Sequence, residues 1–212
     1  MFFLLLGAHF CFAAENISLA KDNWILQNYG TAKPNIISFV DNKINIAVNS
    51  SSSALIYKLE RQEVINSIHA DISIDGDIKY LSQNNEFEED SYFRFGLVVL
   101  GKNKLTAWAQ WISPAWVQNL FLLVPKGSGL DKVYFYNVGQ SEKSVGQSRN
   151  YPQSSYVVER VVAFKNSKKL SIDFKLDSEK TVAAIWISAD ADQTQSVFTT
   201  TIERLKLDKV GP

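Results

Sequence analysis

Arg94 is the residue whose surroundings most demand a chemical partner. It interrupts the apolar stretch Tyr92 to Leu100, which reads as an interior strand. An unpaired guanidinium is costly to bury, so the sequence predicts a carboxylate beside it. Asp90, or an aspartate on a neighbouring strand, would make this a structural ion pair. A ligand carboxylate, as in a uronic acid, is the functional alternative.

Asp190 and Asp192 stand at alternate positions directly after the apolar run Val182 to Ala189. Two carboxylates at a strand end supply half of an oxygen-rich cation site, which makes calcium the candidate cofactor. Calcium takes about six to eight oxygens, so Gln193, Thr194, backbone carbonyls and a remote carboxylate would have to complete the shell. The alternative is a turn in which the aspartates cap backbone N–H groups.

Three of the five tryptophans lie in the stretch Lys104 to Val124. A proline divides it, because proline disfavours α conformation in the residue before it. We expect a strand from Leu105 to Ile112 and a short helix from Pro114 to Leu122. Trp108 and Trp111 are candidate ligand-binding residues, since aromatic faces stack on sugar rings. Packing in the core is the alternative.

His69 is the only histidine outside the first fourteen residues. It is expected on the polar face of a strand, two residues from Asp71, and side chains two apart on a strand point the same way. A His-Asp pair is therefore feasible, and an exposed structural histidine is the alternative. The sequence has no G-x-S-x-G elbow to present a serine nucleophile, and one histidine excludes a three-histidine zinc site.

The elements that must position these residues are strands. Besides Leu105 to Ile112, alternating apolar and polar residues between turn signals predict ten strands, which together with the short helix favour an all-β, jelly-roll-like antiparallel β-sandwich. The expected strands are Ile36–Val40, Ile44–Val48, Leu55–Leu59, Asn66–Asp75, Tyr92–Leu100, Val133–Val138, Tyr156–Phe164, Leu170–Leu176, Val182–Ala189 and Phe198–Leu207.

The first fourteen residues, 1–14, form an apolar run without a charged side chain and resemble a secretory signal cleaved after Ala13 or Ala14. The run is shorter than the roughly 20 residues that span a bilayer, so no transmembrane segment is expected in the mature chain. The only cysteine, Cys11, lies in this run. A periplasmic or secreted protein without disulfides is therefore predicted, with residues 15–212 forming one domain.

Charge excludes one class of partner. Lys plus Arg and Asp plus Glu both number 22, giving a formal net charge of zero. Basic residues are also scattered along the chain, so no field or patch would recruit a polyanion, and nucleic acid is not an expected partner.

Several short motifs together resemble domain of unknown function family 3047, a group of exported bacterial proteins. These are the strand opened by Asp90 to Arg94, the tryptophan stretch, the segment Ile187 to Thr194 with Gln193 in place of the family's Asn, and the strand Ile202 to Leu207. The resemblance departs at Tyr136 to Gly139. It implies a periplasmic β-sandwich similar to carbohydrate-binding jelly rolls, and it marks Asp90, Arg94, Asp190 and Asp192 as special. It implies no activity.

The leading functional hypothesis is a non-catalytic binding module for a glycan or another envelope ligand, with Trp108 and Trp111 as platform and Arg94 and Asp190 as polar contacts. One rival is a glycan-acting enzyme that uses two carboxylates, one from Glu86 to Asp90 and the other Asp190 or Asp192. Another is a structural or assembly protein of the envelope, which predicts an exposed apolar patch.

Overall fold

The structure is a computed structural model that describes residues 13–30, 32–79, 90–103, 115–151 and 154–210. Trp108, Trp111 and the strand predicted over Leu105 to Ile112 lie outside these ranges, as do Cys11 and most of the acidic segment before Asp90. Within the described part of the chain, no helix has the length and hydropathy that a membrane crossing requires.

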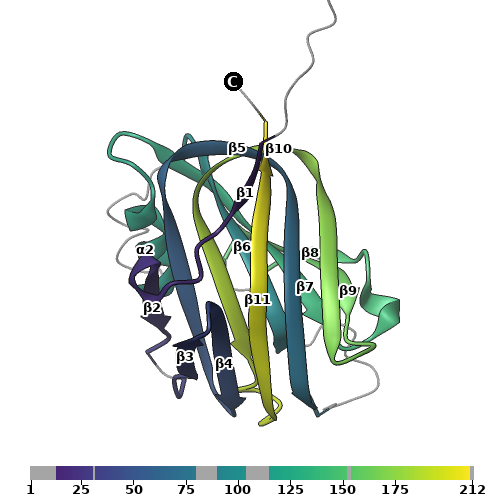
Figure 1. Ribbon diagram of the computed structural model, residues 1–212. Helices are drawn as coiled ribbons and strands as arrows, with labels where there is room; N and C mark the ends of the chain where they lie inside the picture. The colour runs from purple at the N-terminus through teal and green to yellow at the C-terminus, as the bar shows by residue number, and fades with distance from the viewer. Residues whose placement is uncertain (1–12, 31, 80–89, 104–114, 152–153, 211–212) are drawn as a thin grey trace, which may run out of the picture.

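Two long strands organise the fold. β5 (Ser52–Asp77) and β10 (Lys169–Asp190) pair with each other along most of their length and arch together over one end of the molecule (Figure 1). Their register shifts between Lys175 and Lys180 and again between Val182 and Ala184, where both strands bend. Each strand therefore contributes one half to each layer of a β-sandwich.

The two long strands show that the number of separate strands was overpredicted. Leu55–Leu59 and Asn66–Asp75 were expected as separate strands, and both belong to β5. Likewise, the separately expected strands Leu170–Leu176 and Val182–Ala189 both belong to β10, and the segment 177–180 between them is a bend within it. Polar residues occupy the bend of each strand. They are exposed there, although the backbone remains extended and the strand continues. A period of two does not distinguish such a bend from a strand end.

The first layer contains β6, whose two neighbours make it an interior strand as predicted. Neighbouring strands of this layer pair antiparallel, except that β7 and β9 are parallel. In order, the layer consists of β2 (Trp24–Asn28), the first half of β5, the second half of β10, β6 (Ser91–Gly101), β7 (Gly129–Gly139), β9 (Val157–Phe164) and β8 (Ser148–Asn150).

The second layer consists of β3 (Ile36–Val40), β4 (Lys43–Asn49), β11 (Val197–Lys209) and the remaining halves of β5 and β10, with β1 (Ala13–Asn16) paired to β11. The β3 and β4 strands, both predicted, pair as a hairpin. Asp41 and Asn42 make its turn with φ of 50° and 55°, a region that Asp and Asn tolerate. Two 3-10 helices, η1 (Lys21–Asn23) and η2 (Glu142–Ser144), lie in connections.

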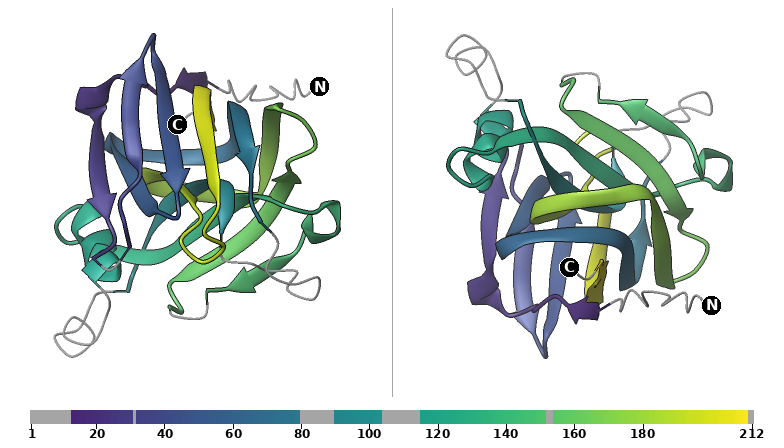
Figure 2. Two further views of the ribbon diagram at one scale, coloured as in Figure 1. Left: turned by 90° about the horizontal axis from the view of Figure 1, so that it is seen from below. Right: turned by 90° about the horizontal axis from the view of Figure 1, so that it is seen from above.

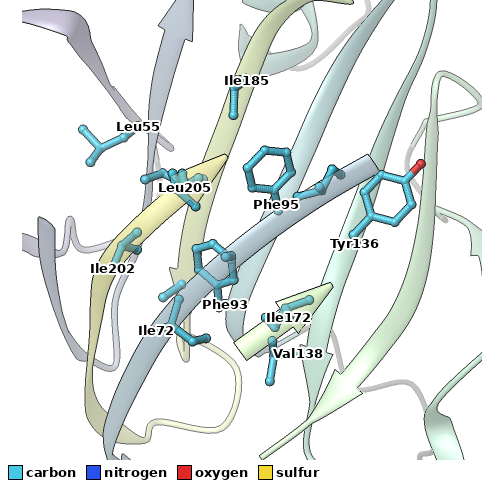
Figure 3. Close-up of a cluster of buried hydrophobic side chains, with 14 of the residues drawn as sticks. Leu55, Ile72, Phe93, Phe95, Tyr136, Val138, Ile172, Ile185, Ile202 and Leu205 are labelled. Atoms are coloured by element: carbon cyan, nitrogen blue, oxygen red, sulfur yellow. The ribbon is translucent and has the colours of Figure 1, made fainter. Parts of the chain in front are cut away.

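The main hydrophobic core lies between the two layers, and Figure 3 shows side chains from both meeting there. β6 contributes Phe93, Phe95 and Leu97, all nearly fully buried. The residues that alternate with them, Arg94 and Gly96, point to the opposite side of the first layer, because successive strand side chains face opposite ways. We call that side the outer face.

The helix α2 (Ala115–Leu123) covers part of the outer face. Its Leu120 is fully buried in a second apolar cluster with Val98, Val133 and Trp186. Asn119 donates a hydrogen bond to Gln27 of β2 (2.8 Å), and Figure 2 shows the helix beside that strand. The short helix predicted from Pro114 is thus present within one residue of its expected bounds.

Candidate functional site

The outer face carries a row of side chains across four strands. The register places Trp186 of β10 beside Gly96 of β6, Gly96 beside Phe135 of β7, and Phe135 beside Glu159 of β9. Trp186 and Glu159 are each only 1% exposed. A buried carboxylate and a buried indole therefore stand at opposite ends of one row.

Gly96 is what allows the two aromatic rings in this row to fit. A Cβ atom on Gly96 would lie 2.6 Å from the Phe135 ring and 2.9 Å from Cβ of Trp186, closer than real contacts allow. Without that atom, the Phe135 and Trp186 rings approach to 5.9 Å between centroids. The glycine thus makes room for an aromatic floor on the outer face.

Arg94 lies in the next row, between Ser188 of β10 and Asn137 of β7. Its Nη1 donates to Oδ2 of Asp190 at 3.0 Å, and its Nε donates to Oδ1 of Asn137 at 3.3 Å. Its guanidinium carbon stands 5.3 Å from the centre of the Phe135 ring. The carboxylate partner that the sequence demanded for Arg94 is therefore Asp190, on the neighbouring strand.

Glu159 extends this network toward the edge of the layer. Its Oε1 lies 3.5 Å from Nη2 of Arg94, and its Oε2 accepts from Nε of Arg149 on β8 at 2.9 Å. The charges alternate in sign from Arg149 to Glu159, Arg94 and Asp190, across β8, β9, β6 and β10. Pairing of this kind is what makes buried charges tolerable.

Asp90 joins the site from the start of β6. Backbone N–H groups of Thr194 and Gln193 donate to its carboxylate at 2.6 and 3.4 Å, so Asp90 caps the turn after β10. One oxygen from each of Asp90, Asp190 and Asp192 lies within 4.8 Å of the others. The structure therefore adds a remote carboxylate to the two aspartates of the sequence-based calcium hypothesis, and calcium binding there stays a prediction.

Burial and neighbouring charge act on Asp190 together. Removal from water raises the pKa of Asp190, the Arg94 guanidinium lowers it, and the carboxylates of Asp90 and Asp192 raise it again, to about 7. The Asp190 carboxyl group consequently exchanges its proton near neutral pH.

Three half-buried aromatic side chains border the site. Tyr29 follows β2, and its ring centroid lies 6.2 Å from that of Trp186. Trp116 of α2 packs edge to face on Tyr151, with 5.8 Å between ring centroids. The hydroxyls of both tyrosines are close enough to Arg94 to interact with it electrostatically. Burial raises the pKa of Tyr29, so its hydroxyl stays protonated and neutral. Aromatic faces and polar groups are thus combined at one place.

Several buried polar atoms in this region lack a hydrogen-bond partner: Ser188 Oγ, Glu159 Oε1 and Trp186 Nε1. The Trp186 indole N–H lies close enough to Tyr29 to interact with it, but no bond of normal geometry forms. Native proteins satisfy the large majority of buried polar groups, so each exception calls for an explanation. These three atoms lie on the outer face, around Arg94. We call this group, with Arg94, Asp190 and the bordering aromatic residues, the Arg94 site.

The structure brings together four of the six predicted binding residues: Asp90, Arg94, Asp190 and Asp192. The other two, Trp108 and Trp111, lie outside the described residues. The sequence reasoning missed Glu159, whose signal was available. In Val157–Phe164 it occupies the same face as Val157 and Val161, which are buried, so an acid there needed a partner.

His69 lies elsewhere, on the outer side of the second layer. Its partners are Asp173 of β10, through Nδ1, and Asp208 of β11, whose Oδ2 lies 2.7 Å from Nε2. Asp71, which the sequence left as a feasible partner, instead pairs with Arg204 at 2.8 Å. His69 thus joins three strands and has a structural position remote from the Arg94 site.

No family model and no curated protein matches the chain. Among solved structures, a xylan-binding module CBM15 is similar over 94% of this chain and 97% of its own, with 9% identity and a TM-score of 0.42. A low-affinity xylan-binding module CBM86 from Roseburia intestinalis gives 93% and 96% coverage, 6% identity and a TM-score of 0.37. A family 11 carbohydrate-binding module from Clostridium thermocellum, in complex with a β-1,3-1,4-mixed-linked tetrasaccharide, is similar over 92% of this chain and 94% of its own. The identity is 11% and the TM-score is 0.42.

Proposed function

We propose that this protein is an exported, non-catalytic module, periplasmic or secreted, that binds a glycan of the bacterial envelope or surroundings at the Arg94 site. The observation that carries the proposal is a buried charged network on the outer face of a sheet, bordered by the half-buried rings of Tyr29, Trp116 and Tyr151. Sugars offer hydroxyls to polar groups and C–H faces to aromatic rings, and this combination serves both.

The partners of the carboxylates favour binding over catalysis. Asp90 accepts two backbone N–H groups, and Asp190 accepts from Arg94 and from the backbone N–H of Ser91 (3.0 Å). A glycosidase acid or base must contact the substrate or a water molecule, whereas both of these carboxylates are buried and already bonded to groups at the ends of β6 and β10. Residues Glu86 to Glu89 of the rival hypothesis lie outside the described residues.

One observation keeps a carboxylate enzyme as a second candidate: the pKa of Asp190, raised to about 7, is suited to a general acid. That candidate predicts release of reducing ends from a soluble glycan by the wild-type protein and none by Asp190→Asn. Binding without any release of reducing ends would exclude the enzyme and leave the non-catalytic binding module.

The binding proposal is tested by titrating the purified protein with a panel of soluble glycans while following heat of binding. Tyr151→Ala should weaken binding about tenfold or more, because it removes a rim ring. Tyr134→Ala is the matched control, since Tyr134 is also half-buried but projects from the opposite face of β7. Lack of binding to every glycan, or equal affinities for wild type and Tyr151→Ala, would contradict the proposal.

A further inference from the structure

We infer that the ligand of the Arg94 site is a saccharide free of acidic groups, whose hydroxyls supply the hydrogen bonds that Glu159 and Ser188 lack. This inference rests on the proposed glycan binding and specifies the class of glycan. It reverses the sequence-based alternative in which Arg94 receives a ligand carboxylate.

The first argument is the balance of charge. Among the described residues, two arginines and four acids gather on this part of the outer face: Arg94, Arg149, Asp90, Glu159, Asp190 and Asp192. Both guanidinium groups are already paired with carboxylates. A uronate, sulfate or phosphate would enter a region that has more negative than positive groups. Like charges placed together at an interface oppose binding.

The second argument is the kind of hydrogen bond that is missing. Oε1 of Glu159 is a carboxylate oxygen, which accepts and does not donate. Oγ of Ser188 both donates and accepts, and Ser188 lies directly beside Arg94 in the register. A sugar hydroxyl can donate to Glu159 and exchange a bond with Ser188, whereas an ionised acidic group has no proton to donate.

The third argument concerns access. Ser188 and Glu159 are 0% and 1% exposed, so a ligand reaches them only when a covering side chain moves. Tyr29 and Tyr151 are the candidates, because both are only half-buried and directly follow the short strands β2 and β8. Gly30 follows Tyr29 directly and has no atom within 4 Å of its Cβ position. Both tyrosines also interact with Arg94, so their displacement is the movement by which the proposed ligand would reach Ser188 and Glu159.

The experiment compares neutral mixed-linkage β-glucan oligosaccharides with oligogalacturonates of the same length, by calorimetry at low ionic strength. We expect the neutral ligand to bind and the acidic one to bind at least about tenfold more weakly. Asp192→Asn, at an exposed position of the site, removes one negative charge and should raise the ratio of acidic-ligand to neutral-ligand affinity about two- to threefold. Glu179→Gln, an exposed acid at the bend of β10, is the charge-matched control and should change neither affinity.

The outcomes separate the two proposals. Equal or tighter binding of oligogalacturonate, or no response of that binding to Asp192→Asn, would overturn the inference and leave glycan binding in place. Failure of both saccharides, and of a wider neutral and acidic panel, would overturn glycan binding itself and the inference with it.

Discussion

Nη1 of Arg94 and Oδ2 of Asp190 lie 3.0 Å apart and join the interior strand β6 to the end of β10. Both residues are less than one-tenth exposed, so the ion pair is buried together with its second carboxylate, Glu159. Removing one member leaves uncompensated charge away from water. The free energy of unfolding, its pH dependence and the affinity for a ligand should therefore all respond to changes at this pair.

Arg94→Met should lower the free energy of unfolding by about 3–5 kcal/mol, since it strands two buried carboxylates. Arg204→Met is the matched control. Arg204 pairs with Asp71 on the surface, where such pairs contribute about 0–1 kcal/mol. Urea unfolding followed by circular dichroism measures both. Similar losses for the two variants would show that the buried network does not stabilise the fold as argued.

Asp190 predicts a pH dependence of stability. Its folded pKa, about 7, exceeds its ordinary value of 3.8, so the folded state holds the proton more tightly than the unfolded state. The contribution of Asp190 therefore becomes less favourable as pH rises from about 4 to 7, by at most about 1.4 kcal/mol per pH unit. Unfolding curves of Asp190→Asn should lack this slope. A variant with the wild-type slope would contradict the assignment.

His69 predicts a second dependence that the Asp190→Asn variant should keep. Burial acts to lower the pKa of His69, but hydrogen bonds to Asp173 and Asp208 outweigh it and the pKa is raised. The stabilisation is present in full below the ordinary pKa of 6.5 and is lost as pH rises through the folded value. Lys206 also pairs with Asp208, at 3.4 Å. Thermal unfolding of His69→Gln from pH 6 to 9 should lose this component, and an unchanged profile would refute it.

Gly96→Ala tests the aromatic floor. The added Cβ would meet the Phe135 ring at 2.6 Å, and overpacking of this kind costs about 1–3 kcal/mol. Gly30→Ala is the control, because its Cβ position is open, and it should change stability by no more than about 0.5 kcal/mol. Equal stabilities of the two variants would show that the rings rearrange freely.

Local sequence patterns predicted what depends on neighbouring residues. The β3 and β4 hairpin follows from its Asp41-Asn42 turn, and the interior position of β6 follows from apolar residues on both faces. The need of Arg94 for a carboxylate was readable in the same way. Each of these conclusions uses only the cost of burying a group or bending the backbone at that point.

Long-range pairing could not be read in this way. That Asp190 rather than Asp90 binds Arg94 depends on the register between β6 and β10, whose residues are far apart in the sequence. The alignment of Glu159 with Phe135 depends on the parallel pairing of β7 and β9. Nothing in either segment alone specifies that neighbour, so the network across four strands emerged only from the fold.

The measurement that tests glycan binding at the Arg94 site most directly is the nuclear magnetic resonance spectrum of the ¹⁵N-labelled indole groups during titration with neutral glucan oligosaccharides. Five tryptophans give five signals, and Trp24→Phe identifies one of them. Trp24 is an internal control, because its indole N–H already donates to the Ser18 carbonyl at 2.9 Å and it packs in the main core. We expect the Trp186 signal, whose N–H makes no hydrogen bond of normal geometry, to shift with saturation while that of Trp24 stays fixed. A saturating ligand that leaves Trp186 unmoved, or a panel that shifts no indole, would contradict the account.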